Sequence, residues 1–403
     1  MNALDLRPDT ARSALSGLVR RRGSDDDVVE RYARALWSTL TEPGDGIAAH
    51  VIAHEGAAHG IRLLEGWCAG VQAAVPGVSD ADFVAGCKRW APRLAAAPIS
   101  VMAPAARAAG VQMIVPADPS WPHSLDDLGM HAPLCLWVRG DVDALNRLQP
   151  SVALVGARAA TGYGELVAAD LASDLAGSGV PIVSGAAYGI DGAAHRAALA
   201  VGGLTVALLA GGVDRAYPAG HADLLRRIAD NGAVVSEVPC GAAPTKWRFL
   251  QRNRLIAALS DATVVVEAGW RSGSLNTAGH AAALSRPLGA VPGPITSAAS
   301  AGCHRLLREY DARCVTSAAD VRELIGRGGL DTRQPAGPFP THGESATDDR
   351  SRVRDALSTR TWRGTDDIAQ RSGMSRDDVE MILGFLRLDG EVRSSADGWR
   401  RAT

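Results

Sequence analysis

Residues 180–195, with the sequence VPIVSGAAYGIDGAAH, set the architecture of the middle of the chain. A short apolar run predicts a strand, a turn rich in glycine follows it, and an alanine-rich run then predicts a helix. Gly185 and Gly189 let the backbone approach a ligand where a Cβ would collide. The free N–H groups and the dipole at such a helix N-terminus attract anions. Taken alone, this turn is equally compatible with a tight connection that binds nothing.

Strand-like and helix-like runs alternate on both sides of this segment, over residues 151–325. Uninterrupted apolar strands separated by helices predict a parallel sheet that is covered on both faces. The expected strands are 152–155, 181–183, 205–209, 234–235, 263–266 and 288–291. The expected helices are 163–177, 190–201, 220–230, 250–260, 274–285 and 300–309. Ligands of such sheets bind beyond the carboxyl ends of the strands, where this chain carries its glycine-rich loops.

The composition is that of an ordinary globular protein and does not indicate a class of ligand. The 403 residues suffice for two or three domains, and charged residues make up 21% with a net charge of -2. Any surface for nucleic acid must therefore be local. Lysine occurs only at Lys88 and Lys246, so arginine supplies nearly all positive charge. Arginine suits bidentate phosphate contacts, although a GC-rich genome produces the same bias.

The sequence favours a cytoplasmic protein without a metal site. The six cysteines lie far apart and form no C-x-x-C pair, as expected for reduced thiols. The N-terminus lacks the apolar core of a secretory signal, and no stretch is apolar enough to span a membrane. His50 and His54 are one helical turn apart, but no third ligand accompanies them, so zinc is not expected.

Helical and loop-like regions flank the predicted sheet. Residues 1–24 are polar and are expected to be mobile. Between residues 110 and 140, two short strands around a proline-rich turn are expected to form a connector. Three short helices and an Asp-Gly hairpin at the C-terminus predict a winged helix. The predicted units are an N-terminal helical domain at 25–107, a sheet domain with its connector at 108–325, a linker at 326–349 and a winged helix at 350–403.

Loops at the ends of the predicted strands carry polar residues. The loop 156–164 offers backbone amides, Arg158 and Thr161, but it lacks the G-x-G-x-x-G spacing of a dinucleotide site. A second loop places hydroxyl groups at a helix start, at 272–274. Asp191 in the turn described above could cap the helix that begins there or act in catalysis, and the sequence leaves both roles open.

The run KWRFLQRNR at 246–254 contains four cations and two aromatic residues in nine positions, with no acid. Cations interleaved with aromatic rings suit single-stranded nucleic acid, because they neutralise phosphates while the rings stack on unpaired bases. The alternative is a helix start whose arginines extend their stems over the surface into solvent.

These motifs, in this order, resemble the DprA/Smf family of DNA-processing proteins. The resemblance rests on VGAR and TGYG in 155–164, SG, GID and AH in 184–195, YP at 217–218, SE at 236–237, RNRLI at 252–256, E, SGSL and TA in 267–278, and VPG at 291–293. It implies an α/β fold with an extended Rossmann-like parallel sheet, an N-terminal helical domain and a C-terminal winged helix. It also implies a dimer that binds single-stranded DNA without sequence specificity and loads RecA recombinase during natural transformation.

The resemblance and the loop chemistry together name a candidate DNA-binding set. By similarity, the phosphate-contacting residues are Arg158, Lys246, Arg252 and Arg254. The full expected set is Arg158, Thr161, Ser184, Gly185, Gly189, Lys246, Arg248, Arg252, Asn253, Arg254, Ser272, Gly273 and Ser274. One departure is His221, where the family usually has Asn, and it leaves the role of the loop 215–221 in DNA binding open.

An enzymatic alternative comes from a related fold family that cleaves nucleoside monophosphates and carries P-G-G-x-G-T-x-x-E. Thr277 stands where that family has its catalytic glutamate, so we expect no hydrolysis, no catalytic residue and no cofactor. A protein that only binds a nucleotide ligand remains the other alternative.

The C-terminal unit is expected to contact protein rather than DNA. Residues 351–403 contain ten arginines and nine acids, and the helix that would enter a major groove begins Ser375-Arg376-Asp377-Asp378. Carboxylates in this first turn stabilise the helix through its dipole, but they would repel the phosphates and base edges of DNA. Fold analogy alone does not establish duplex binding.

Overall fold

The computed structural model describes the chain except for residues 1–3, 21–22, 95–98, 328–348, 396 and 403. The predicted linker 326–349 therefore lies almost wholly outside the described residues.

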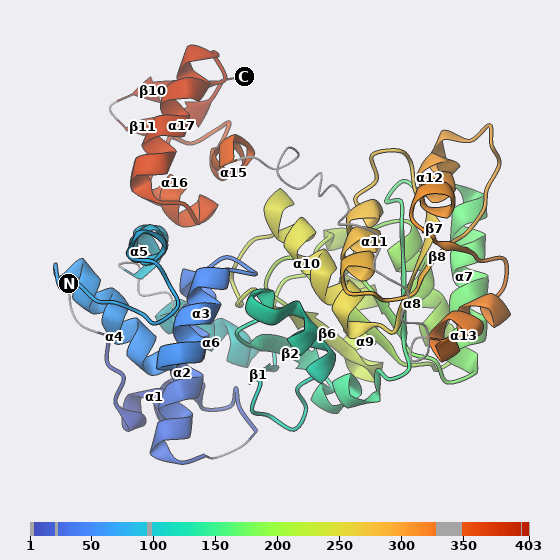
Figure 1. Ribbon diagram of the computed structural model, residues 1–403, viewed down its shortest axis with the longest axis horizontal. Coiled ribbons are helices and arrows are strands. Elements are labelled where there is room, and N and C mark those ends of the chain that lie inside the picture. Colours follow the sequence, from blue (N-terminus) through green and yellow to red (C-terminus); the bar gives the residue numbers. More distant parts are fainter. Residues whose placement is uncertain (1–3, 21–22, 95–98, 328–348, 396, 403) are drawn as a thin grey trace.

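A nine-stranded sheet forms the centre of the protein (Figure 1). Its order is β1-β2-β6-β5-β4-β3-β7-β8-β9, and every neighbouring pair from β6 to β9 is parallel. The strands are β1 Val111–Ile114, β2 Leu136–Gly140, β3 Val152–Gly156, β4 Ile182–Ser184, β5 Thr205–Leu208, β6 Ala233–Ser236, β7 Ala262–Glu267, β8 Leu288–Ala290 and β9 Arg313–Cys314. All six predicted strands are present, and the α/β fold class is confirmed.

The predicted connector is part of this sheet. Strands β1 and β2 pair antiparallel with each other, and β2 pairs antiparallel with β6. Trp137 of β2 lies opposite Ser236 of β6. This pairing satisfies the backbone groups that the edge of β6 would otherwise expose.

Helices cover both faces of the sheet, because alternate residues of each strand point to opposite sides. Val155 and Val265 join a core with helices α10, α11 and α12, whereas Leu154 and Val264 join a core with α7, α8 and α13. The helices are α7 Gly162–Gly177, α8 Ile190–Ala200, α9 Ala222–Asn231, α10 Lys246–Leu259, α11 Ser274–Ala283, α12 Ala301–Glu309 and α13 Ala318–Arg327. Short 3-10 helices are η1 His123–His131, η2 Val142–Arg147, η3 Ala219–His221 and η4 Ala298–Ser300.

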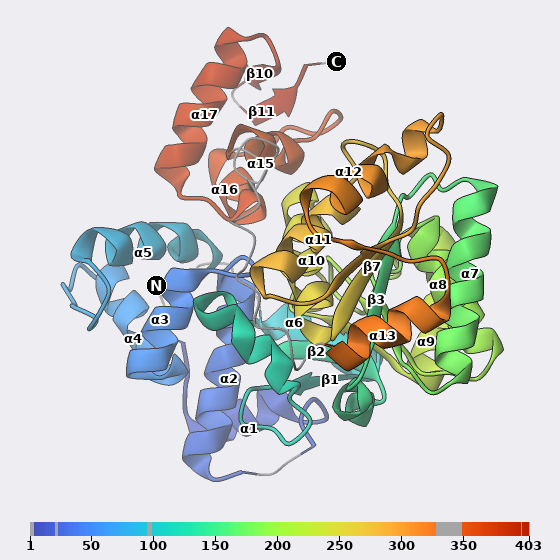
Figure 2. The same ribbon diagram turned by 45° about the vertical axis from the view of Figure 1, so that its right-hand side comes forward.

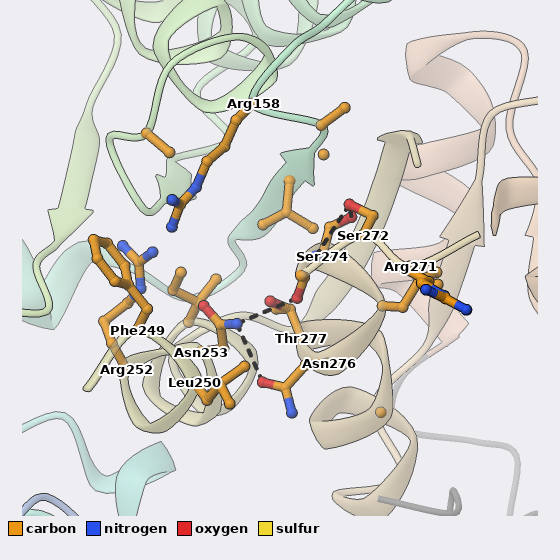
Figure 3. A pocket seen from close by; sticks show the side chains of 18 of the residues that line it. Arg158, Phe249, Leu250, Arg252, Asn253, Arg271, Ser272, Ser274, Asn276 and Thr277 are labelled. Carbon is orange, nitrogen blue, oxygen red and sulfur yellow. Dashed lines mark hydrogen bonds between the residues drawn. The ribbon is translucent and has the colours of Figure 1, made fainter. Parts of the chain in front are cut away.

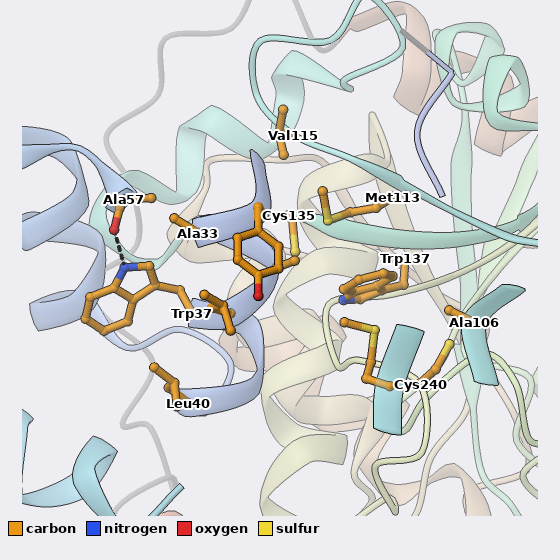
Figure 4. Packing of buried hydrophobic residues seen from close by; sticks show 14 of the residues in the cluster. Ala33, Trp37, Leu40, Ala57, Ala106, Met113, Val115, Cys135, Trp137 and Cys240 are labelled. Atoms are coloured by element: carbon orange, nitrogen blue, oxygen red, sulfur yellow. Dashed lines mark hydrogen bonds between the residues drawn. The ribbon is translucent and has the colours of Figure 1, made fainter. Parts of the chain in front are cut away.

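The N-terminal helices share one hydrophobic core with the antiparallel edge of the sheet. This core runs from Trp37 to Met113 and Trp137, and the Trp37 indole donates a hydrogen bond to the Ala57 carbonyl at 3.0 Å (Figure 4). The helices are α1 Pro8–Leu15, α2 Asp25–Leu40, α3 Gly46–Glu55, α4 Ala57–Cys68, α5 Asp80–Leu94 and α6 Ile99–Ala108.

Helix α1 corrects the expectation of a mobile N-terminus for residues 8–18, whereas residues 1–3 and 21–22 of the predicted range 1–24 lie outside the described residues. Ala11 and Leu15 of α1, and Leu18 after it, are buried in the shared core. Apolar residues are few and widely spaced in this segment, so its sequence alone shows little helical periodicity.

The C-terminal unit contains three helices followed by a hairpin and has its own small core. Its elements are α15 Asp349–Ala356, α16 Thr365–Ser372, α17 Arg376–Leu388, β10 Val392–Ser395 and β11 Gly398–Arg401. These are the elements that the sequence predicts for a winged helix.

This unit lies against α5 and the start of α10 (Figure 2). The Arg93 Nε of α5 donates to the Gln370 carbonyl of α16 at 2.8 Å, and Lys88 pairs with Asp377 at 3.2 Å. The guanidinium of Arg352 lies 5.2 Å from the Trp247 ring centroid. These contacts join the C-terminal unit to the N-terminal helices, through α5, and to the helices that cover the sheet, through α10.

Candidate nucleic-acid interface

A cavity of about 1450 Å³ lies beyond the carboxyl ends of β3 and β7. The loop after β3, the loop after β7 and the facing sides of α10 and α11 form most of its walls (Figure 3). Helix α12 and the C-terminal unit add Arg305 and Arg401 to the lining. This is the place that parallel-sheet topology predicts for a ligand.

The loop that carries Arg158 is held in place by buried contacts. Glu267 accepts hydrogen bonds from the backbone N–H and the hydroxyl of Thr161, at 2.8 and 2.7 Å. Gly189 adopts a φ of +72°, and a Cβ there would lie 2.3 Å from the Ala157 carbonyl oxygen. Only glycine permits this close approach. Gly189 and Thr161 therefore hold the Arg158 loop in place without lining the cavity themselves.

Arg158 stacks on an aromatic ring inside the cavity. Its guanidinium carbon lies 4.5 Å from the Phe249 ring centroid, and that of Arg252 lies 5.7 Å from the same centroid. Arg252 is buried and donates to the Gly185 carbonyl at 2.6 Å. Burial lowers the Arg252 pKa to about 10, so this side chain stays charged at neutral pH.

Polar groups of α10, α11 and the loop before α11 also line the cavity. The Asn253 amide donates to Asn276 Oδ1 at 3.1 Å, and the hydroxyls of Ser272 and Ser274 are 2.8 Å apart. Figure 3 shows Arg158 and Phe249 on one side of the cavity and Arg271 on the other.

Among the described residues, the cavity lining has a marked excess of positive charge. It contains six Lys or Arg side chains against the two carboxylates Asp191 and Asp355. His280 also lines it, but burial lowers the His280 pKa to about 4, so that ring is neutral at pH 7. A polyanion is the ligand class that this lining favours.

The structure brings seven of the candidate DNA-binding residues to the cavity. They are Arg158, Lys246, Arg252, Asn253, Ser272, Gly273 and Ser274. Thr161 and Gly189 hold the Arg158 loop, Ser184 is buried and donates to the Leu154 carbonyl, and Gly185 accepts from Arg252.

Two of the predicted arginines lie in ion pairs outside the cavity lining. Arg254 pairs with Glu237 at 2.7 Å, and its side chain is 3% exposed. Arg248 pairs with Glu42 at 2.8 Å, and Glu42 also pairs with Arg93. In this structure both guanidinium groups therefore neutralise carboxylates from other segments.

Asp191 stabilises the glycine turn and does not cap the helix. Its carboxylate accepts from the backbone N–H groups of Gly185 and Ala187 at 3.1 and 3.4 Å, whereas Gly189 occupies the N-cap position of α8. Burial raises the Asp191 pKa.

Sequence reasoning missed several residues that line the cavity. Phe249 lies in the quoted cationic run, but nothing in that run distinguishes it from Trp247, which packs under Arg352 instead. The Tyr217 ring lies 5.5 Å from that of Phe249, although His221 had left the role of this loop open. The other cationic and aromatic lining residues that were missed are Trp270, Arg271, Arg305, Tyr310 and Arg401.

The described residues contain no group of three His, Cys, Asp or Glu side chains that could hold a metal ion. Within the same residues, each helix is too short or too polar to cross a bilayer.

Comparison with known protein families matches residues 112–326 to the family described as DNA recombination-mediator protein A. A putative DNA processing protein DprA of Mycobacterium tuberculosis is 47% identical over 305 residues, which cover 72% of this chain and 77% of the relative. The chain belongs to the DprA family. The resemblance found in the sequence motifs is thereby confirmed.

Other DprA-family members extend this match. The protein Smf of Escherichia coli is 35% identical over 283 residues, covering 67% of this chain and 72% of the relative. The X-ray structure of DNA processing protein A from Streptococcus pneumoniae aligns with a TM-score of 0.59 at 31% identity, covering 72% of this chain and 97% of that one. The residues that match the family model, 112–326, include strands β2 to β9 and the loops that follow β3 and β7.

Proposed function

We propose that the protein binds single-stranded DNA without sequence specificity in the cavity beyond β3 and β7. The stacking of Arg158 on Phe249 carries this proposal, because it places a cation and an aromatic face side by side. Phosphates and unstacked bases require that pair of groups, and neither group reads one base in particular.

The size of the cavity favours a strand over a single nucleotide. Sites for small ligands have volumes of about 300–1,000 Å³, and this cavity has about 1450 Å³.

Membership of a family described as recombination mediators supports a further proposal, that the protein passes bound DNA to RecA recombinase during transformation. We also propose that it acts in the cytoplasm as a homodimer.

Substituting Arg158 tests the DNA site directly. The R158A variant loses one phosphate contact and should therefore bind single-stranded DNA about tenfold more weakly. This factor corresponds to the free energy of one hydrogen bond to a charged group. The slope of log K against log salt should also flatten by about 0.7. Gel shifts with single- and double-stranded DNA at several salt concentrations measure both effects. Unchanged affinity and slope would remove Arg158 from the site.

We propose that the protein has no hydrolytic activity towards nucleotides. Thr277 lines the cavity where the nucleotide-cleaving family has a glutamate, and Glu267 is engaged by Thr161. Purified protein incubated with DNA, ATP or nucleoside monophosphates should give no product above the buffer control. Turnover that is lost in E267Q would favour the enzymatic alternative.

We propose that the C-terminal unit contributes little to DNA affinity. Asp377 at the start of α17 pairs with Lys88, and Met381 and Phe385 of the same helix are 56% and 53% exposed. Carboxylates and apolar side chains suit a protein contact better than a phosphate backbone. To the cavity lining this unit adds Arg401 and Asp355, whose opposite charges offset each other. A chain that ends near residue 329 should keep most single-strand binding, and the fragment 347–403 should not shift duplex DNA at moderate salt. Tight duplex binding by that fragment would contradict this assignment.

A further inference from the structure

Trp270 is a large aromatic side chain left exposed at the edge of the cavity. It lies on the loop after β7, lines the cavity and is 56% exposed. Single exposed apolar residues are common on protein surfaces and need no explanation by themselves. Trp270 differs from them because its surroundings fix the ring.

The ring of Trp270 packs against an ordered cation. The guanidinium carbon of Arg305 lies 5.2 Å from the Trp270 ring centroid. Arg305 is itself held by Glu309, at 2.9 Å from its Nε, and by the Tyr310 hydroxyl, at 2.8 Å from its Nη2. A cation on an indole face is a stabilising arrangement, and here Arg305 of α12 supplies the cation. The indole is thereby positioned before any ligand arrives.

Trp270 and Phe249 belong to different parts of the cavity wall. Phe249 lies on α10 beside the loop after β3, whereas Trp270 lies on the loop after β7 beside α12. Figure 3 places Arg271, the next residue after Trp270, across the cavity from Phe249. In Figure 3 the side chains of Ser272, Ser274 and Asn253 lie between Phe249 and Arg271, as polar groups suited to a sugar-phosphate backbone.

We propose that Trp270 is a second base-stacking platform, which receives a base from the same single strand several nucleotides away from the base at Phe249. This inference rests on the proposed single-stranded DNA function. Arg271 and Arg305 accompany Trp270 as Arg158 and Arg252 accompany Phe249, so both ends of the cavity combine an aromatic ring with cations. The cavity then offers two stacking residues, Phe249 and Trp270, and only a strand long enough to reach both can use both contacts.

The test is the dependence of affinity on oligonucleotide length. Full-length wild-type protein, F249A and W270A are titrated with oligothymidylates from 2 to 20 nucleotides. F249A should weaken binding at every length. W270A should match the wild type for the shortest strands and bind the long ones about fivefold or more weakly, the effect of one lost stacking contact. W270F should restore most of the long-strand affinity, because a base stacks on any aromatic face.

Trp362 supplies a matched control. It also packs against a cation, with the Arg400 guanidinium carbon 4.7 Å from its ring centroid, but it does not line the cavity. W362A should therefore bind strands of every length like the wild type. Quenching of tryptophan fluorescence by long oligothymidylates should be smaller in W270F than in the wild type, a difference that a purely structural role would not produce.

The outcomes separate this inference from the proposed function. If the wild type binds and W270A binds identically at all lengths, the second platform is refuted and single-strand binding stands. If W270A weakens even the shortest strands as F249A does, Trp270 belongs to the Phe249 site and the inference is also refuted. If the wild type binds no single strand at any length, the proposed function fails together with the inference.

Discussion

Replacing Glu42 with alanine is expected to destabilise the protein by about 3–5 kcal/mol, because the change leaves the buried Arg93 and the largely buried Arg248 without their partner. The Glu42 side chain is 11% exposed and pairs with both Arg93 and Arg248. Arg93 also donates to the Gln370 carbonyl, so the loss should loosen the C-terminal unit as well. Urea unfolding measures the first effect, and limited proteolysis of the chain measures the second.

An exposed ion pair provides the control for this experiment. Asp223 pairs with Arg226 at 2.6 Å, and its side chain is 70% exposed. D223A should change the stability by less than about 1 kcal/mol, as surface pairs usually do. If E42A unfolds at the same urea concentration as D223A, the Glu42 cluster does not contribute the expected stability.

The same cluster predicts loss of stability in acid. Burial alone would raise the Glu42 pKa, but the charges of Arg248 and Arg93 outweigh it and hold the pKa well below its ordinary value of 4.5. A carboxyl whose pKa is lowered by folding stabilises the native state above its unfolded pKa. This contribution should therefore be complete above about pH 4.5 and decrease as the pH falls further, and E42Q should lack it.

Replacing Arg254 with alanine is expected to have a large effect on folding and a small one on DNA binding. The change leaves the largely buried Glu237 without its cation, which should cost about 3–5 kcal/mol. The surviving folded protein should keep the wild-type salt slope for single-strand binding, unlike R158A. The two variants are therefore compared by thermal unfolding and by the salt dependence of affinity.

The reverse pattern would restore the role that family resemblance implies for Arg254. If R254A keeps its stability and flattens the slope by about 0.7, Arg254 contacts a phosphate and its pairing with Glu237 yields to DNA. E237Q provides the matched test, because it removes the charge of the partner and keeps the arginine.

The candidate site was predictable in its location more than in its members. The strand-end loops, the hydroxyls at 272–274 and the run 246–254 all lie where parallel-sheet topology places ligands. Trp270 was visible in the sequence as an aromatic residue beside Arg271, but no local pattern shows whether a tryptophan is exposed. The cation that packs on its ring is Arg305 of α12, which lies 35 residues further along the chain.

The sequence by itself determined the fold class and the family. Apolar runs that are buried on both faces and alternate with helical runs permit few arrangements other than a covered parallel sheet. Short motifs in a fixed order then identified the relatives. These signals are local, so each can be recognised without knowing what lies next to it in space.

Only the tertiary structure decided which arginines face the cavity. Arg248, Arg252 and Arg254 occur within seven residues of one helix, yet Arg252 lines the cavity whereas the other two pair with carboxylates. Glu42 lies 206 residues from Arg248 in the sequence, and Glu237 lies 17 residues from Arg254. Whether a guanidinium is available to a phosphate depends on which acid folding brings within 3–4 Å of it, because a close partner of opposite charge neutralises it. That proximity arises only when the chain packs, so the local sequence around an arginine does not predict its acidic partner.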